Sequence, residues 1–133
     1  MKKGSKNIKV LIVEDNKNIC EMYAITFMRK GFTVYTASDG RSALEKFRNK
    51  QPDLVLLDIM MPGMDGHQVL AEIRRDVSRY VPVIMLTNLD ATDFTRESRL
   101  EHIDDYLVKS HFSPREVVEK AQEVLRINKI AVD

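Results

Sequence analysis

Five polar residues stand at the carboxyl ends of short apolar runs that are spread along the chain. Glu14 and Asp15 follow the first run, Asp58 and Thr87 end two later runs, and Lys109 follows the last. In a parallel sheet such strand ends meet at one edge, where the ligands of open α/β sheets bind. The spacing therefore predicts one pocket that holds three carboxylates, a hydroxyl and an ammonium.

The residue types of this pocket indicate phosphoryl chemistry with a metal ion. Three carboxylates repel one another unless a cation lies among them. Ligation by oxygen alone is typical of Mg²⁺, which is commonly completed by water and phosphate oxygens. Thr87 offers a hydroxyl and Lys109 a positive charge for such a phosphate. A carboxylate such as Asp58 can itself take the phosphoryl group as an acyl phosphate.

Each position also has a simpler interpretation when it is taken alone. Glu14 and Asp15 could be a solvated pair at a helix start, favoured there by the helix dipole. The other three could be a turn residue, a strand end and a surface lysine. We favour the common pocket because the simpler interpretations require that all of these strand ends carry suitable polar groups by chance.

The chain alternates short apolar runs with longer amphipathic segments, which is typical of strands and helices in turn. Strands are predicted at residues 8–13, 32–37, 53–58, 81–87 and 105–108. Helices are predicted after Asn16, at residues 40–49, from Asp65, at residues 92–101 and from Ser113. The helix at 92–101 is the weakest of these predictions because it has few apolar anchors.

Local signals mark several helix ends. Asn16 is a predicted N-cap, and Gly31 stands where a left-handed residue closes the first helix. Capping boxes, in which an N-cap side chain and a residue three places later bond to each other's backbone, are predicted at Asp65 with Gln68 and at Ser113 with Glu116.

Five strands, each followed by a helix, predict an α/β domain with a parallel sheet that is covered on both faces. The 133 residues suffice for one compact domain. We place it at residues 8–127, between a flexible N-terminal tail at 1–7 and a C-terminal tail at 128–133.

Composition argues against several classes of function. A net charge of +1 gives no field that would attract nucleic acid or a membrane surface. No apolar run approaches the length of a membrane span, and a single cysteine cannot form an intramolecular disulfide. We expect a soluble, cytoplasmic protein that binds neither nucleic acid nor membranes.

Four stretches resemble the receiver domain of two-component response regulators. They are VLIVEDN, PDLVLLDIMMPGMDG, PVIMLT and DDYLVK, which occur in this order between Val10 and Lys109. The resemblance covers nearly the whole chain, from Ile8 to about Ile127. It implies a flavodoxin-like (βα)5 three-layer sandwich whose five-stranded parallel sheet has the order 2-1-3-4-5.

The resemblance also implies a role for each residue of the pocket. Asp58 is the phosphoacceptor, and Lys109 pairs with the phosphoryl group. Asp15 and Asp58 bind Mg²⁺ directly, with the backbone carbonyl of Met60 as a further ligand. Glu14 is the acidic neighbour that acts on the metal through water.

Two further residues would carry the switch. By the same resemblance, Thr87 follows the phosphoryl group inward, and Tyr106 is the aromatic residue that changes rotamer with it. Tyr106 has an equally good interpretation as an ordinary core aromatic residue.

The implied function is that of a stand-alone receiver which is not an enzyme beyond its own phosphorylation and autodephosphorylation. Asp58 would be loaded by a sensor histidine kinase or a histidine phosphotransfer protein. The switching surface would comprise the fourth helix, the fifth strand and the fifth helix, and it would bind a downstream protein target or a second copy of the chain.

Three residues depart from the family pattern. Ser110 replaces the proline that usually follows the lysine, often through a cis bond; a cis bond before a non-proline residue costs about 3–4 kcal/mol, so we predict a trans bond here. Asn88 replaces a very small residue and could alter the lifetime of the acyl phosphate. His102 replaces a glycine before the last strand and is expected to be a re-routed or strained cap.

Three alternatives remain open at this stage. An aspartyl-nucleophile phosphatase on a related sheet usually carries a second aspartate two residues after the first, where this chain has Met60. A flavin or nucleotide carrier is disfavoured because acidic strand ends would repel phosphate without a metal. A receiver fold that binds partners without being phosphorylated is kept open by Ser110 and Asn88.

Overall fold

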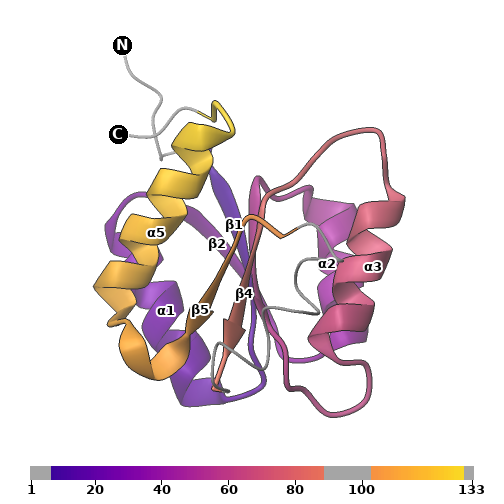
Figure 1. The fold of residues 1–133 in the computed structure, drawn as a ribbon, viewed down its shortest axis with the longest axis horizontal. Helices are drawn as coiled ribbons and strands as arrows, with labels where there is room; N and C mark the ends of the chain where they lie inside the picture. The colour runs from indigo at the N-terminus through magenta and orange to yellow at the C-terminus, as the bar shows by residue number, and fades with distance from the viewer. Residues whose placement is uncertain (1–6, 89–102, 131–133) are drawn as a thin grey trace.

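The computed structural model describes residues 7–88 and 103–130, and within them the chain forms one parallel sheet (Figure 1). The strand order is β2-β1-β3-β4-β5, which confirms the predicted order. Each strand adds one parallel pairing to its neighbour, so all carboxyl ends lie at the same edge. The strands are β1 (Lys9–Val13), β2 (Thr33–Ala37), β3 (Leu54–Asp58), β4 (Val83–Thr87) and β5 (Asp105–Val108).

Four α-helices cover the two faces of the sheet within the described residues. Figure 1 shows α1 and α5 on one face and α2 and α3 on the other, which gives the predicted three layers. A short 3-10 turn, η2 (Lys109–His111), follows β5. The predicted helix at 92–101 and His102 lie outside the described residues. The helices are α1 (Lys17–Arg29), α2 (Gly40–Lys50), α3 (Gly66–Arg75) and α5 (Pro114–Ile127).

The helices begin where the sequence signals indicate. The Asn16 side chain accepts a hydrogen bond from the Ile19 N–H at 3.0 Å. Both predicted capping boxes are present, one at the start of α3 and one at the start of α5. Gly31 follows α1 with a φ of +94°, a conformation that glycine adopts without steric cost.

Four strands begin one or two residues later than predicted, and for β3 and β4 the reason can be identified. Pro82 has no N–H to give to a sheet ladder, and β4 starts after it, although the Pro82 carbonyl accepts a hydrogen bond from Val55. The Asp53 side chain accepts a hydrogen bond from the Lys9 N–H at 2.8 Å. Asp53 therefore caps the start of β1 instead of extending β3.

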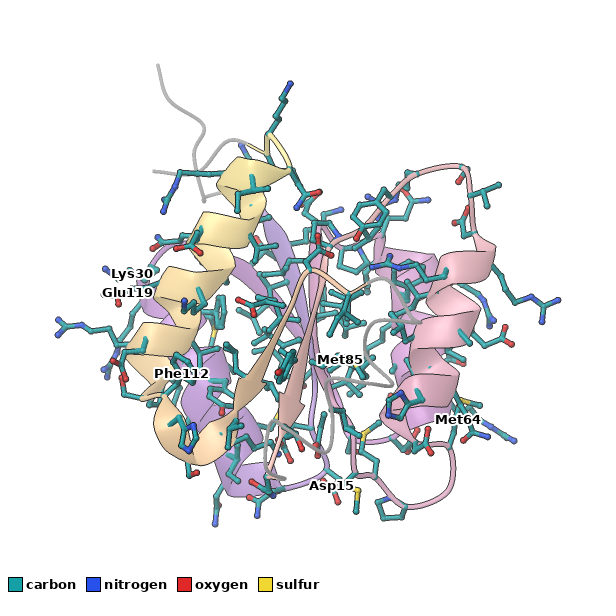
Figure 2. All side chains as sticks on the ribbon, viewed as in Figure 1. Asp15, Lys30, Met64, Met85, Phe112 and Glu119 are labelled. Carbon is teal, nitrogen blue, oxygen red and sulfur yellow. The ribbon has the colours of Figure 1, made fainter. Side chains whose placement is uncertain are left out.

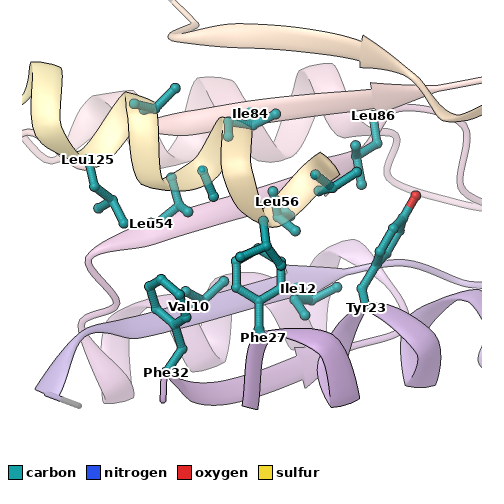
Figure 3. Close-up of a cluster of buried hydrophobic side chains, with 14 of the residues drawn as sticks. Val10, Ile12, Tyr23, Phe27, Phe32, Leu54, Leu56, Ile84, Leu86 and Leu125 are labelled. Atoms are coloured by element: carbon teal, nitrogen blue, oxygen red, sulfur yellow. The ribbon is translucent and has the colours of Figure 1, made fainter. Parts of the chain in front are cut away.

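Alternate residues of the central strands feed two separate cores. One core lies between the sheet and helices α1 and α5, and contains Val10, Leu56 and Phe27 (Figure 3). The other lies between the sheet and helices α2 and α3, and contains Leu57 and Met85. Because both faces of the sheet are covered, β1, β3 and β4 read as continuous apolar runs.

A polar cluster at the amino-terminal edge of the sheet ties several elements together. The Asp104 carboxylate accepts hydrogen bonds from the Tyr80 hydroxyl at 2.7 Å and from the Val83 N–H at 2.9 Å. Its other oxygen accepts from the Asn128 side chain at 3.2 Å, and the Arg74 guanidinium lies 3.6 Å away. Asp104 thus joins α3, the start of β4, the start of β5 and the end of α5.

The first residues of the segment assigned to a C-terminal tail form a packed turn. The Ile130 N–H donates to the Leu125 carbonyl at 2.8 Å, and Lys129 has a φ of +62°. Ile130 packs against the core beneath α5. The turn closes the last helix because its backbone bonds satisfy carbonyl groups that a helix end leaves open.

Candidate functional site

Three carboxylates meet at the carboxyl edge of the sheet, as the topology predicts. Val13 of β1 pairs with Leu57 of β3, which sets the next residues, Glu14 and Asp58, side by side. One oxygen from each of Glu14, Asp15 and Asp58 lies within 4.8 Å of the others. Glu14 and Asp58 are 1% and 3% exposed, whereas Asp15 is exposed to solvent.

Lys109 completes this cluster from the end of β5, the edge strand that lies two places from β3. It begins the 3-10 turn directly after β5, and its side chain reaches back across the edge. Its Nζ atom lies 2.5 Å from Glu14 Oε1 and 3.3 Å from Asp58 Oδ1. Both contacts are nearly excluded from solvent, where charges interact more strongly than at the surface.

The electrostatics of the cluster disfavour a charged Asp58. Burial, and next the neighbouring Glu14 charge, raise the pKa of Asp58 from 3.8 to about 7, although the Lys109 ammonium opposes the change. One ammonium thus faces three carboxyl groups. A divalent cation would relieve the repulsion, and the solvent-facing Asp15 leaves room for the waters that Mg²⁺ retains. The donor set therefore fits Mg²⁺.

The loop after β3 holds Asp58 in place through backbone contacts. The Met60 N–H points at Asp58 Oδ1 across 3.3 Å, and the Gly66 N–H donates to the Ile59 carbonyl at 2.9 Å. A Cβ atom on Gly66 would lie 2.5 Å from the Asp58 carbonyl oxygen and 2.7 Å from Ile59 Cα. Gly66 is thus a site residue to which the sequence patterns assigned no role, although it stands directly after the predicted N-cap Asp65.

Thr87 and Tyr106 lie on one face of the neighbouring strands. Leu86 pairs with Asp58 and Met85 with Tyr106, so Thr87 is one position beyond the partner of Asp58. Because side chains alternate along a strand, Thr87 and Met85 share a face. Tyr106 is partly buried against the core that contains Met85. Thr87 is fully buried.

Two of the three departures from the expected pattern, Asn88 and Ser110, line one pocket with Lys109. The described residues contain no cis peptide bond, so the Lys109–Ser110 bond is trans, as predicted. Ser110 belongs to the 3-10 turn, and Asn88 is exposed directly after β4. Figure 2 shows the exposed Asp15 at the end of the sheet toward which the arrows of β4 and β5 point.

A groove gives solvent access to the acidic cluster. It has a volume of about 560 Å³ and is lined by Glu14 and Asp15 together with residues of α1, β2 and α2, among them Cys20, Ser42 and Lys46.

Among the described helices, none is long and apolar enough to cross a membrane.

Comparison with known proteins gives one consistent result. Residues 10–122 match the response regulator receiver domain family. The chain is 40% identical over 126 residues to the alkaline phosphatase synthesis transcriptional regulatory protein PhoP of Bacillus subtilis, covering 94% of this chain and 51% of that protein. It is 48% identical over 120 residues to the probable transcriptional regulator ycf27 of Guillardia theta, covering 89% of this chain and 45% of that protein.

A solved structure agrees with these sequence matches. The chemotaxis response regulator CheY4 of Vibrio cholerae superposes with a TM-score of 0.82 and 32% identity, over 89% of this chain and 98% of that one. The chain spans about half the length of the curated relatives it matches.

Proposed function

This chain belongs to the response regulator receiver domain family, and we propose that its Asp58 accepts a phosphoryl group in a Mg²⁺-dependent reaction. Receiver domains are signalling domains that interact with histidine kinases or phosphotransfer proteins. The observation that carries the proposal is the contact of Lys109 with both Glu14 and Asp58 inside a cluster of three carboxylates.

In the proposed reaction, an Asp58 oxygen attacks the phosphorus of a phosphohistidine. The new bond joins that oxygen to phosphorus, the bond between phosphorus and the histidine nitrogen breaks, and the nitrogen leaves with its electron pair and takes up a proton. Lys109 stabilises negative charge on the transferring oxygens because its ammonium already lies against Asp58. Mg²⁺ held by Asp15, Asp58 and the Met60 carbonyl would supply further charge neutralisation.

The buried position of Asp58 suits a switch because the new charge must be accommodated. A phosphoryl group brings about −1.5 to −2 charges and three acceptor oxygens. On phosphorylation, the Lys109 ammonium would give up one of its two carboxylate contacts and bind a phosphoryl oxygen. Thr87 would donate its hydroxyl to it, and Tyr106, on the same face, would follow that movement. Residues 92–101, together with β5 and α5, would then form the surface that binds a partner protein. Hydrolysis of the acyl phosphate would return the domain to its unphosphorylated state.

We place the docking surface of the phosphodonor protein over α1. Met22, Ile25 and Met28 are each about half exposed along this helix, whose first residue, Lys17, lines the groove that opens at Glu14 and Asp15. Methionine-rich surfaces adapt to helical partners. A charge at Met22 would then slow transfer from a phosphohistidine protein and leave phosphorylation by a small donor unchanged.

Two other functions fit less well. A phosphatase of the aspartyl type would need an acid or base at position 60, where the chain has an exposed methionine side chain. A receiver fold that only binds partners would not need the buried set of Glu14, Asp58 and Lys109. Stand-alone action through protein contacts and a cytoplasmic location are further parts of the proposal. The two transcriptional regulators named above are about twice as long as this chain, whereas CheY4 is of similar length.

Incubation with acetyl phosphate and Mg²⁺, followed by intact mass, tests the proposal. We expect the parent protein to gain one phosphoryl group. Asp58→Asn should gain none, while the matched variant Asp53→Asn, at the opposite edge of the sheet, should behave as the parent does. An unchanged parent mass would refute the proposal. Continuous turnover of p-nitrophenyl phosphate would instead support the phosphatase.

A further inference from the structure

A small pocket lies beside Lys109, next to the acidic cluster. It has a volume of about 220 Å³ and lies between α1 and the turn after β5. Its lining includes Tyr23, Asn88, Lys109, Ser110 and Phe112. Lys109 belongs to both places, because its ammonium contacts Glu14 and Asp58 while its side chain forms part of the pocket wall.

Tyr23 extends from α1 toward this pocket. Side chains on a helix point toward its N-terminus, and the N-terminus of α1 lies at the carboxyl edge of the sheet. The ring is 3% exposed within the core beneath α1 and α5. Figure 3 shows its hydroxyl group directed away from Phe27, beside the end of β4 at Leu86.

The Tyr23 hydroxyl group has no hydrogen bond to any described residue. The charges of Glu14 and Asp58 nevertheless affect its pKa. Burial, and next the charges of Glu14 and Asp58, raise the pKa of Tyr23 to about 12. The hydroxyl group therefore stays protonated under all ordinary conditions. A phenylalanine would fill the same core space without a polar atom to desolvate, so packing alone does not account for a tyrosine here.

Lys109 has one more donor than its present contacts use. An ammonium carries three N–H donors, and Glu14 and Asp58 take two of them. With a phosphoryl group on Asp58, Lys109 would have to bond to the phosphoryl oxygens as well, and a third hydrogen-bond partner would fix the direction of its ammonium. Tyr23 lines the same pocket as Lys109, and its hydroxyl group can accept this hydrogen bond.

We propose that Tyr23 is a positioning residue, whose hydroxyl group accepts a hydrogen bond from Lys109 and holds its ammonium on the phosphoryl group during transfer to Asp58. This inference rests on the proposed phosphoacceptor function. It assigns to α1 a direct part in the reaction, in addition to its packing against the sheet.

Replacing Tyr23 by phenylalanine tests the inference because the ring is kept and only the hydroxyl group is lost. The rate of phosphorylation is measured against acetyl phosphate concentration at saturating Mg²⁺ by intact mass. We expect Tyr23→Phe to lower the maximal rate roughly tenfold, which corresponds to about 1.4 kcal/mol in the barrier. The acetyl phosphate concentration at half-maximal rate, the Mg²⁺ affinity and the unfolding midpoint in urea should stay unchanged.

A matched control is Tyr35→Phe on β2, whose ring lies near Lys50 instead of Lys109; it should retain the parent rate. A Tyr23→Phe protein that reacts within twofold of the parent would overturn the inference. So would a slower reaction accompanied by a lower unfolding midpoint or a higher half-maximal concentration, since these indicate a packing role. If the parent itself gains no phosphoryl group, the proposed function fails instead.

Discussion

Replacing Asp58 by asparagine should stabilise the metal-free protein at neutral and alkaline pH. The change keeps the shape of the side chain and an oxygen that can accept from the Met60 N–H, but it removes a buried negative charge beside Glu14. A carboxylate that serves the proposed phosphoryl transfer carries this cost in stability, which is common where a site needs a strained or desolvated group. The asparagine protein would lack that cost.

The magnitude follows from the pKa of Asp58, which rises from 3.8 to about 7 on folding. Each tenfold change in acidity corresponds to 1.36 kcal/mol, so holding the carboxylate ionised in the fold costs about 4 kcal/mol. This figure already includes the attraction of Lys109, because that attraction acts on the same pKa. It is a large part of the 5–15 kcal/mol by which ordinary domains are stable.

The direction in which the stability of the fold changes with pH follows from the same pKa shift of Asp58. The folded protein binds the Asp58 proton more tightly than the unfolded chain does, so its stability falls as pH rises from about 4 to about 7. The advantage of Asp58→Asn should be near zero below pH 4, grow across that interval and level off above pH 7. Urea unfolding in the presence of EDTA, repeated from pH 4 to 8.5, measures this difference directly.

Mg²⁺ should reduce the difference, because the cation stabilises the parent carboxylate and has less to bind in the asparagine variant. Equal urea midpoints for the two proteins across the whole pH range would refute the account of the site, since they would mean that Asp58 is charged in the fold without penalty. Asp53→Asn, which alters an aspartate at the other edge, controls for the general effect of removing a charge.

Three further predictions concern other parts of the molecule. Glu14→Gln should lower the pKa of Asp58, because a like charge is removed, and should raise the Mg²⁺ concentration for half-maximal phosphorylation roughly tenfold; titration of the metal checks this. Gly66→Ala should cost about 1–3 kcal/mol in urea unfolding and slow phosphorylation, because its methyl group meets the Asp58 backbone; a parent-like rate would contradict it. Asp104→Ala should cost about 1–3 kcal/mol by leaving the Tyr80 hydroxyl and a β4 N–H without their acceptor, yet leave the phosphorylation rate within twofold of the parent.

The strand ends and helix caps were predictable because they depend on local patterns. A continuous apolar run predicts a strand covered on both faces, and a parallel order then brings Glu14, Asp58 and Lys109 to one edge whatever the side chains do. Likewise Asp65 and Ser113 cap their helices through bonds that span only three residues. These features need no knowledge of how the helices pack.

The side-chain contacts that the site residues make in the unphosphorylated protein were not predictable in the same way. The sequence assigned Lys109 to a phosphate, whereas in the structure its shortest contact is to Glu14. That choice depends on the path of a long side chain across two strands. The closeness of Gly66 to Asp58 depends on the angle at which α3 leaves the sheet, and the pocket shared by Tyr23 and Lys109 depends on the packing of α1 against the turn after β5.

The Asp104 cluster gives the two edges of the sheet different mechanical properties. At the amino-terminal edge, one carboxylate fastens the beginnings of β4 and β5 to the ends of α3 and α5. At the opposite edge the described connections are short loops and the 3-10 turn η2. Amide hydrogens there should exchange through local opening, while those near Asp104 wait for global unfolding. A load applied at the carboxyl edge would then tilt α5 and β5 about their fixed ends instead of displacing them as a whole. The displacement caused by a small change at Lys109 would therefore be greatest at the first turn of α5, at Pro114.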